Sequence, residues 1–379
     1  MTMNINNRAY QICKRCVMDT TAPDITFDDN GFCNFCTEYI RKSAPSYAKL
    51  REKQKSLSLL LDKIKVCGKK KKYDCIIGVS GGLDSSYTLY LAKQYGLRPL
   101  AVNLDNGWDV DFAKNNINSL VQKLRVDLYN YRVNWQEFRD LQLSLLKSHV
   151  VDIEMITDNA IQAFCYQTAK KFGIKYILAG TNTATEGMRM PQNWNWFKLD
   201  KKNILNIHKR FGSIALTTIP LMGTLDFIKY SIIDGIKWIS FLDLVDYNKQ
   251  NALNILAKDI GYHQYPYKHY ESIFTRFYQG YILPRKFNID KRKLHFSNLI
   301  CSGQMTRAEA IEKLKEPPYP DANTMQEDVK IFLNKLDWTM EQLEEYVSTK
   351  GIPHEYYGTE KLLWHFFSQI LKISRRILG

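Results

Sequence analysis

The sequence predicts an α/β protein built on a doubly wound, mostly parallel sheet, with a four-cysteine unit before it and a helical region after it. Short apolar runs typical of buried strands alternate with segments of helical periodicity between residues 68 and 260. Two C-x-x-C pairs precede this alternation, and helix formers dominate beyond Pro317. We therefore expect three regions: an N-terminal zinc unit with a helical linker (1–67), the sheet domain (68–260) and a mostly helical region (261–379).

The composition is that of a folded protein with a basic surface. Apolar residues make up 45% and charged residues 24% of the 379 residues, which excludes a disordered or fibrous chain. The net charge of +14 favours polyanionic partners such as nucleotides, sugar nucleotides, nucleic acids or anionic membranes, without choosing among them. Neither a secretory signal nor an apolar run long enough to span a membrane is found. We therefore expect a cytoplasmic protein.

Four N-terminal cysteines have the spacing of a zinc site. Cys13 and Cys16 form one C-x-x-C pair, and Cys33 and Cys36 form another. Each pair directs two thiolates at one point, and two pairs complete a tetrahedron around Zn²⁺. An iron–sulfur cluster and unligated or redox-active cysteines are the alternatives, and a disulfide is disfavoured in a reducing cytoplasm. Because four thiolates leave no open position, we expect the zinc to be structural.

A glycine–serine turn follows the first predicted strand, Cys75–Val79, and leads into a helix. Gly81 and Gly82 let backbone amides approach an anion, and the helix N-terminus adds its dipole. The predicted hydroxyl donors to phosphate are Ser80, Ser85 and Ser86. Asp84 is of a type that caps helices. The Walker A pattern is missing, which disfavours motor proteins and GTPases.

This turn resembles the SGGxDS loop of the PP-loop, or N-type, ATP pyrophosphatases. The positions that match are Ser80, Gly81, Gly82, Asp84 and Ser85. The resemblance implies the fold of the adenine nucleotide alpha hydrolases and cleavage of ATP between its α and β phosphates. A substrate oxygen is adenylated, and a nitrogen or sulfur nucleophile then displaces AMP. The resemblance also implies that Asp84 helps to hold Mg²⁺ beside the pyrophosphate.

Three further strands are predicted at Leu100–Asp105, Val126–Val133 and Lys175–Asn182, the last after a helix near Asp158–Phe172. Ligands of doubly wound sheets bind at the carboxyl ends of the strands. Asp105, Gly180 and Thr181 should therefore lie on the same edge as the turn, and in the resembling enzymes loops at such positions contact ATP. The alternative for Asp105 is a turn former, and the alternative for the loop from Gly180 is a polar strand-to-helix turn.

Two later segments are basic and aromatic. PP-loop enzymes supply cations to the leaving pyrophosphate from a late segment, and Lys268 and Arg276 are the candidates, with Asp84 completing the predicted catalytic set. The alternative is a solvated basic face. Residues from Leu362 onwards form a basic amphipathic helix, which is predicted either to pack on its own domain or to contact a partner or an anionic membrane.

The motifs taken together resemble the N-acetyl sugar amidotransferase family of bacterial surface-polysaccharide (LPS O-antigen) and flagellin-glycan biosynthesis. They are the four-cysteine unit, IIGVSGGLDSS, ILAGTNTATEG and YPYKHYES, between about Cys13 and about Arg307. The resemblance implies conversion of an acetamido group on a nucleotide-linked sugar into an acetamidino group, with ATP and Mg²⁺. It also implies ammonia from separate glutaminase and cyclase-like subunits, with no nucleic acid partner.

Two other functions stay open. A tRNA-modifying PP-loop enzyme, either a thiolase or an amidating ligase, would use the zinc unit and the positive charge to bind RNA. Cys75 and Cys165 are poor sulfur carriers for it, because they are predicted to lie inside a strand and a helix. A non-enzymatic zinc-knuckle adaptor with a decayed nucleotide site is the third possibility, which the intact turn disfavours.

Overall fold

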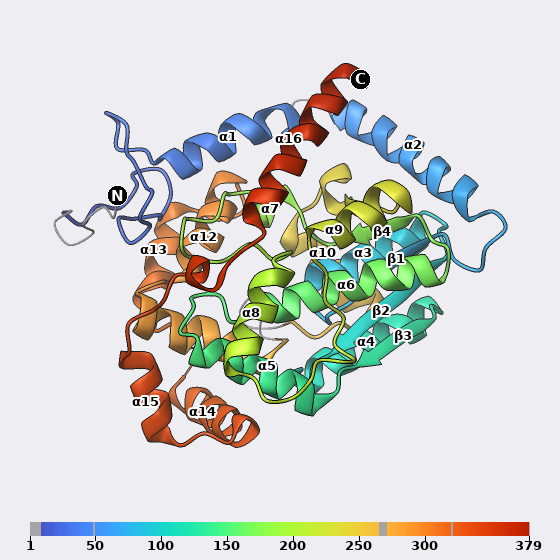
Figure 1. The fold of residues 1–379 in the computed structure, drawn as a ribbon. Helices are drawn as coiled ribbons and strands as arrows, with labels where there is room; N and C mark the ends of the chain where they lie inside the picture. Colours follow the sequence, from blue (N-terminus) through green and yellow to red (C-terminus); the bar gives the residue numbers. More distant parts are fainter. Residues whose placement is uncertain (1–8, 48–49, 265–270, 320, 379) are drawn as a thin grey trace.

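A parallel sheet forms the centre of the molecule. The computed structural model describes residues 9–47, 50–264, 271–319 and 321–378. Within these residues five strands pair in the order β3-β2-β1-β4-β5, all parallel (Figure 1). They are β1 (Cys75–Gly78), β2 (Pro99–Asp105), β3 (Leu128–Arg132), β4 (Tyr176–Ala179) and β5 (Lys237–Ser240). The chain proceeds outward from β1 to β3 and returns to the other side at β4. The predicted doubly wound sheet is therefore confirmed, with its switch point between β1 and β4.

Helices cover both faces of the sheet. Ile77 of β1 belongs to one buried cluster and its neighbour Ile76 to the other, as the two-residue period of a strand requires. The first cluster is completed by α2 (Leu50–Gly68), α3 (Leu83–Gln94), α4 (Asp111–Leu124) and α10 (Lys249–Ile260). The second is completed by α5 (Trp135–Lys147) and α6 (Met155–Lys171), among other elements. β1 and β2 have continuous apolar runs because both strands are buried on both faces of the sheet.

The remaining elements are mostly helical, as predicted for the C-terminal region. The α-helices are α1 (Asn34–Tyr47), α7 (Thr183–Glu186), α8 (Lys201–Phe211), α9 (Thr224–Ile228), α11 (Ile273–Phe277), α12 (Lys291–Cys301), α13 (Arg307–Lys315), α14 (Ala322–Leu336), α15 (Met340–Ser348) and α16 (Lys361–Leu378). π-Helical segments span Lys229–Ile233 and Tyr278–Phe287, and 3-10 segments span Phe241–Leu244 and His354–Tyr357. Among the described helices, none combines the length and apolar character that a membrane crossing requires.

One buried core joins the three predicted regions. Cys36 in the N-terminal unit, Ile156 beside the sheet and Phe332 in the helical tail belong to the same cluster of buried side chains. Helices end at Gly68 and at Ile260, close to the two predicted boundaries. The boundaries themselves stay a prediction.

Candidate active site and metal centre

The predicted phosphate turn lies at the switch point of the sheet, between β1 and α3. Gly82 occupies the N-cap of α3. Gly81 has a φ of +79°, and a Cβ atom there would lie 2.6 Å from the carbonyl oxygen of Ala113 in α4. The Gly81 carbonyl accepts hydrogen bonds from Tyr262 Oη at 3.1 Å and from Asn116 Nδ2 at 3.4 Å. Only glycine fits this left-handed, closely packed position. The turn is held by its packing against α4 and by the two hydrogen bonds to the Gly81 carbonyl.

Ser80 and Ser85 line the exposed side of the turn. Ser85 Oγ accepts a hydrogen bond from the Ser80 amide and Ser80 Oγ accepts one from the Gly82 amide, both at 3.3 Å. The two hydroxyl oxygens are themselves 3.3 Å apart. Hydroxyl and amide groups thus gather at one exposed place beside a helix N-terminus, an arrangement that suits a phosphate group. Ser86 differs, because its side chain is fully buried and the structure does not bring it to this side.

Asp84 lies in the first turn of α3 and not at its cap. The capping interpretation of Asp84 is therefore wrong, because Gly82 takes that position. The Asp84 carboxylate accepts a hydrogen bond from the hydroxyl of Tyr247. Burial, together with the charge of Asp84, raises the pKa of Tyr247 well above its ordinary value, so this hydroxyl stays a donor. A carboxylate held beside the phosphate turn is a suitable Mg²⁺ ligand, and that role stays a prediction.

The loop after β4 packs directly on this turn. A Cβ atom at Gly180 would lie 2.7 Å from the carbonyl carbon of Asp84 and 2.8 Å from the amide nitrogen of Ser85. Thr181 Oγ1 lies 3.0 Å from Ser240 Oγ at the end of β5. The structure therefore brings Gly180 and Thr181 to the edge that carries the turn, although their contact with ATP stays a prediction.

Gly180→Ala is expected to raise the KM for ATP at least about tenfold, because the added methyl group pushes the β4 loop away from α3. Steady-state kinetics of AMP formation measure this effect. Gly173→Ala is the control for a loss of stability alone: with a φ of +65° alanine strains the backbone there, but a Cβ atom meets nothing within 4 Å and Gly173 lies before β4, away from the turn. An unchanged KM in Gly180→Ala would show that the β4 loop does not shape the nucleotide site.

Three carboxylates, those of Asp105, Asp109 and Glu271, lie near the phosphate turn. Asp105 Oδ1 accepts a hydrogen bond from the Gly107 amide at 2.9 Å, so Asp105 forms a turn, and its predicted contact with ATP stays a prediction. Glu271 Oε1 lies 3.4 Å from the position that a Cβ atom would take at Gly82. Burial and the charges of Asp105 and Glu271 raise the pKa of Asp109 to about 7. Sequence analysis gave no role to Asp109, four residues after Asp105, or to Glu271, which lies inside the YPYKHYES motif.

Asp109 should make the stability of the ligand-free protein depend on pH. Between about pH 4 and pH 7 folded Asp109 keeps a proton that the unfolded chain has lost, so the free energy of unfolding falls as the pH rises through this window. Asp109→Asn should remove that part of the fall. Urea unfolding at pH 5 and pH 8, without Mg²⁺ or ATP, tests this expectation. An equal pH dependence in both proteins would contradict it.

Of the two cations predicted for the pyrophosphate, Lys268 lies outside the described residues. Arg276 lies in α11, where its Nε and Nη2 atoms each lie 2.6 Å from a carboxylate oxygen of Asp328 in α14. Asp328 is 1% exposed and also accepts a hydrogen bond from Tyr319 at 2.7 Å. Arg276 therefore ties α11 to α14, and its contact with pyrophosphate stays a prediction.

A pocket opens beside Tyr247 at the same edge of the sheet. It is lined by Asn182 and Thr183 at the start of α7, by Asp243 and Tyr247 after β5, and by Lys53 of α2, among others. Asn182 caps α7 by accepting a hydrogen bond from the Thr185 amide at 2.8 Å. The carboxyl ends of β4 and β5 thus border a pocket of mixed polar and apolar lining that reaches Tyr247, the hydrogen-bond partner of Asp84.

A buried ionic cluster lies at the start of α6. Lys198 Nζ is 2.5 Å from Asp152 and 2.8 Å from Asp158, and Asp152 is fully buried. The ring of His354 accepts a hydrogen bond from the Asp152 amide through Nε2 at 3.2 Å. Burial lowers the pKa of His354 to about 3, which keeps this nitrogen unprotonated. The cluster joins the C-terminal region to the sheet domain, and sequence analysis missed it because its members are far apart in the chain.

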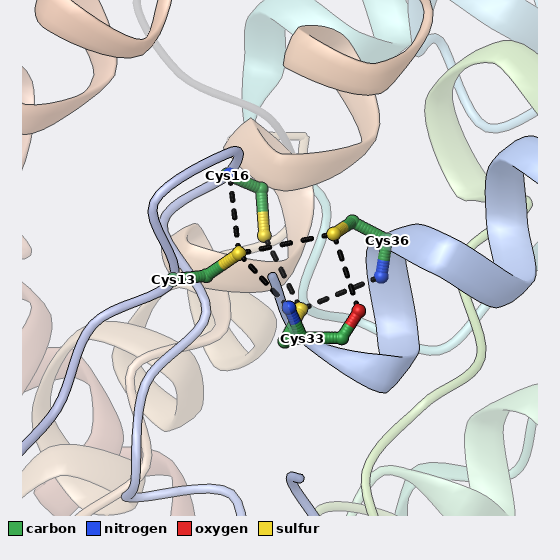
Figure 2. A group of neighbouring side chains, drawn as sticks. All are labelled: Cys13, Cys16, Cys33 and Cys36. Atoms are coloured by element: carbon green, nitrogen blue, oxygen red, sulfur yellow. Dashed lines mark hydrogen bonds between the residues drawn. The ribbon is translucent and has the colours of Figure 1, made fainter. Parts of the chain in front are cut away.

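The four N-terminal cysteines meet at one point, as predicted (Figure 2). All four are buried, and their sulfur atoms lie within 4.8 Å of one another. The sulfur atoms of Cys13 and Cys36 are 3.8 Å apart, and those of Cys16 and Cys33 are 3.6 Å apart. A tetrahedron with Zn–S bonds of about 2.3 Å has edges of about 3.8 Å. The side chains therefore fit a structural zinc ion.

Hydrogen bonds to sulfur favour the thiolate form that a metal needs. The amides of Cys16 and Cys33 donate to Cys13 Sγ at 3.4 Å and 3.2 Å. Hydrogen bonding with the neighbouring thiols of Cys16 and Cys33 lowers the pKa of Cys13 to about 6. Cys301 of α12 lies beside Cys36, and this contact raises its pKa. It is a fifth thiol near the centre that the sequence spacing does not reveal.

The metal centre is docked on the C-terminal region. Arg307 of α13 donates hydrogen bonds to the carbonyl oxygens of Cys13 and Cys16 at 2.9–3.1 Å. Lys293 of α12 forms an ion pair with the buried Asp19 at 2.5 Å. The four-cysteine unit therefore holds α12 and α13 in place.

Comparison with known proteins finds a family match for the C-terminal region. Residues 271–371 match the family model described as "LPS biosynthesis protein WbpG-like, C-terminal domain". NMN synthetase from Francisella tularensis shows a distant structural likeness, with 15% identity and a TM-score of 0.29 over 61% of this chain and 98% of that chain. A sequence comparison with curated proteins finds no significant match. The C-terminal region of this chain is therefore similar to the C-terminal domain of WbpG-like proteins of lipopolysaccharide biosynthesis.

Proposed function

We propose that this protein is an ATP-dependent amidotransferase of surface-polysaccharide biosynthesis, which converts the acetamido group of a nucleotide-linked N-acetyl sugar into an acetamidino group. The observation that carries the proposal is the SGGLDS turn at the switch point of a doubly wound sheet, with the β4 loop packed on it. The match of residues 271–371 to a WbpG-like domain supports the lipopolysaccharide setting.

The proposed chemistry explains why ATP is needed. An amide carbon is a poor electrophile, and its oxygen is a poor leaving group. Attack of the amide oxygen on the α phosphate forms a C–O–P bond and releases pyrophosphate. Ammonia then adds to the carbon, the C–O bond breaks, and AMP leaves with the former amide oxygen. The turn amides and the N-terminus of α3 would stabilise the phosphates. Asp84 would hold Mg²⁺, which neutralises charge on the leaving pyrophosphate.

The buried cysteines support an external source of ammonia. Cys75 and Cys165 are almost fully buried. Burial raises the pKa of Cys165 to about 12 and that of Cys75 still further, so neither thiol is an active nucleophile. Such thiols suit neither a glutaminase nor a sulfur-carrying tRNA thiolase. The glutaminase and cyclase-like subunits that we propose as the source of ammonia follow from the resemblance to the N-acetyl sugar amidotransferases, and the burial of these two thiols agrees with an external source.

The test is AMP and pyrophosphate release by the purified protein with ammonium chloride and a panel of UDP- and CMP-linked acetamido sugars. The proposal predicts AMP formation that depends on one of these sugars. AMP formation that depends on tRNA and on no sugar would replace the proposal with a tRNA-modifying enzyme. Failure to bind ATP would favour the zinc-knuckle adaptor.

A further inference from the structure

The last helix, α16, presents an apolar row that the described part of the chain leaves uncovered. Leu362, Phe366 and Ile370 follow one another at every fourth position, which places them on one side of the helix. Their exposed fractions are 83%, 65% and 47%. Single exposed apolar residues are common, but three in a row on one helix indicate a contact surface.

The other side of α16 fixes the helix to the body. The ring of Trp364 lies 5.2 Å from that of Phe197 and 5.1 Å from that of Phe227, measured between centroids. Glu360, just before the helix, accepts a hydrogen bond from the Thr224 amide at 2.9 Å. Figure 1 shows the helix extending from this anchor to the edge of the molecule, where the C-terminus lies. The apolar row is therefore exposed on a helix whose first turns are already packed.

The charge of α16 indicates what covers the row. Its sequence contains no acidic residue and four basic ones, Lys361, Lys372, Arg375 and Arg376. A second copy of this chain, with its net charge of +14, would be repelled by it. A helix that combines an apolar side, aromatic residues and an excess of cations is typical of helices that lie in the headgroup region of anionic membranes.

We propose that α16 docks this protein on the surface of an anionic lipid bilayer. The helix lies parallel to the surface, with Leu362, Phe366 and Ile370 inserted at the boundary of headgroups and acyl chains. This inference does not depend on the proposed reaction, because it rests on the exposed row and the charge of α16 alone.

Vesicle co-sedimentation of the full chain tests the proposal. Vesicles of phosphatidylcholine with about one quarter phosphatidylglycerol should bind the protein, and vesicles of phosphatidylcholine alone should bind it at least about tenfold more weakly. Leu362→Gln/Phe366→Gln/Ile370→Gln should lose at least about tenfold in binding to the anionic vesicles, since glutamine preserves helix propensity but removes the apolar row. Val66→Gln on α2 is the matched control, because Val66 is a 73% exposed apolar residue on another surface helix.

Three results would overturn the proposal. They are equal binding to both kinds of vesicle, undiminished binding of the triple variant, and failure of the wild-type chain to bind anionic vesicles. If the wild-type chain binds no vesicles but forms a dimer that the triple variant abolishes, the row is a protein contact instead. The melting temperature of the triple variant verifies folding, which these exposed substitutions should preserve.

Discussion

Asp84→Asn is expected to lower ATP-dependent AMP formation by about 100- to 1,000-fold, the range found when one preorganised electrostatic contact is lost from an active site. The carboxylate lies in the first turn of α3, beside the phosphate turn, and accepts the hydroxyl hydrogen bond of Tyr247. Asparagine keeps the shape and an acceptor oxygen but removes the charge that would hold Mg²⁺. AMP formation at saturating ATP and Mg²⁺ measures the loss.

Asp259→Asn provides the matched control for this experiment. Like Asp84, Asp259 accepts a hydrogen bond from a tyrosine. Its carboxylate in α10 accepts this bond from Tyr90 of α3 at 2.6 Å. That site lies later in α3, away from the phosphate turn, so AMP formation should stay within about twofold of the wild type. If Asp84→Asn retained full activity with a normal melting temperature, Asp84 would have no role in the reaction.

Cys16→Ser is expected to remove the bound zinc and to lower the melting temperature by on the order of 10 °C. Cys16 is fully buried, and its sulfur completes a set of four whose spacing fits a tetrahedral site. Without the metal, the loop that carries Cys13 and Cys16 is less firmly held. The hydrogen bonds from Arg307 to the carbonyl oxygens of these residues, which join the N-terminal unit to α13, should therefore weaken. Metal content by mass spectrometry and thermal unfolding measure the two effects together.

Cys67→Ser is the control, because Cys67 is an exposed thiol outside the cluster. It should keep both the zinc content and the melting temperature. A strong chelator should reproduce the effect of Cys16→Ser on the wild-type protein. Unchanged stability in Cys16→Ser, or iron in place of zinc in the purified protein, would contradict a structural zinc site.

Local patterns predicted the centre of the fold well. β1 and β2 are buried on both faces, so their apolar runs stand out, and the SGGLDS turn between β1 and α3 marks the switch point. β5 escaped prediction because it is a four-residue edge strand, Lys237–Ser240, with partly exposed side chains. Its sequence carries neither an apolar run nor a clear alternation. Periodicity detects buried strands better than short edge strands.

Long-range contacts explain what the sequence left undetermined in the site. Asp109 and Glu271 meet near the phosphate turn although more than 150 residues separate them. Arg276 looked like a free cation in a basic segment, but Asp328, which binds it, lies 52 positions further on. The resemblance also left the tail beyond Pro317 unassigned, whereas the WbpG-like match extends through it to residue 371. Spacing identifies ligands that are close in sequence, as for the cysteines, but not partners brought together by the tertiary fold.

The most direct test of the proposed function is the fate of the acetamido oxygen. The sugar nucleotide that stimulates AMP release is labelled with ¹⁸O at its acetamido carbonyl and incubated with ATP, Mg²⁺ and ammonium chloride. We predict that the AMP formed gains the ¹⁸O atom and that the sugar becomes about one mass unit lighter than its unlabelled parent, as oxygen is replaced by NH. Unlabelled AMP together with an unchanged acetamido group would contradict the amidotransferase assignment.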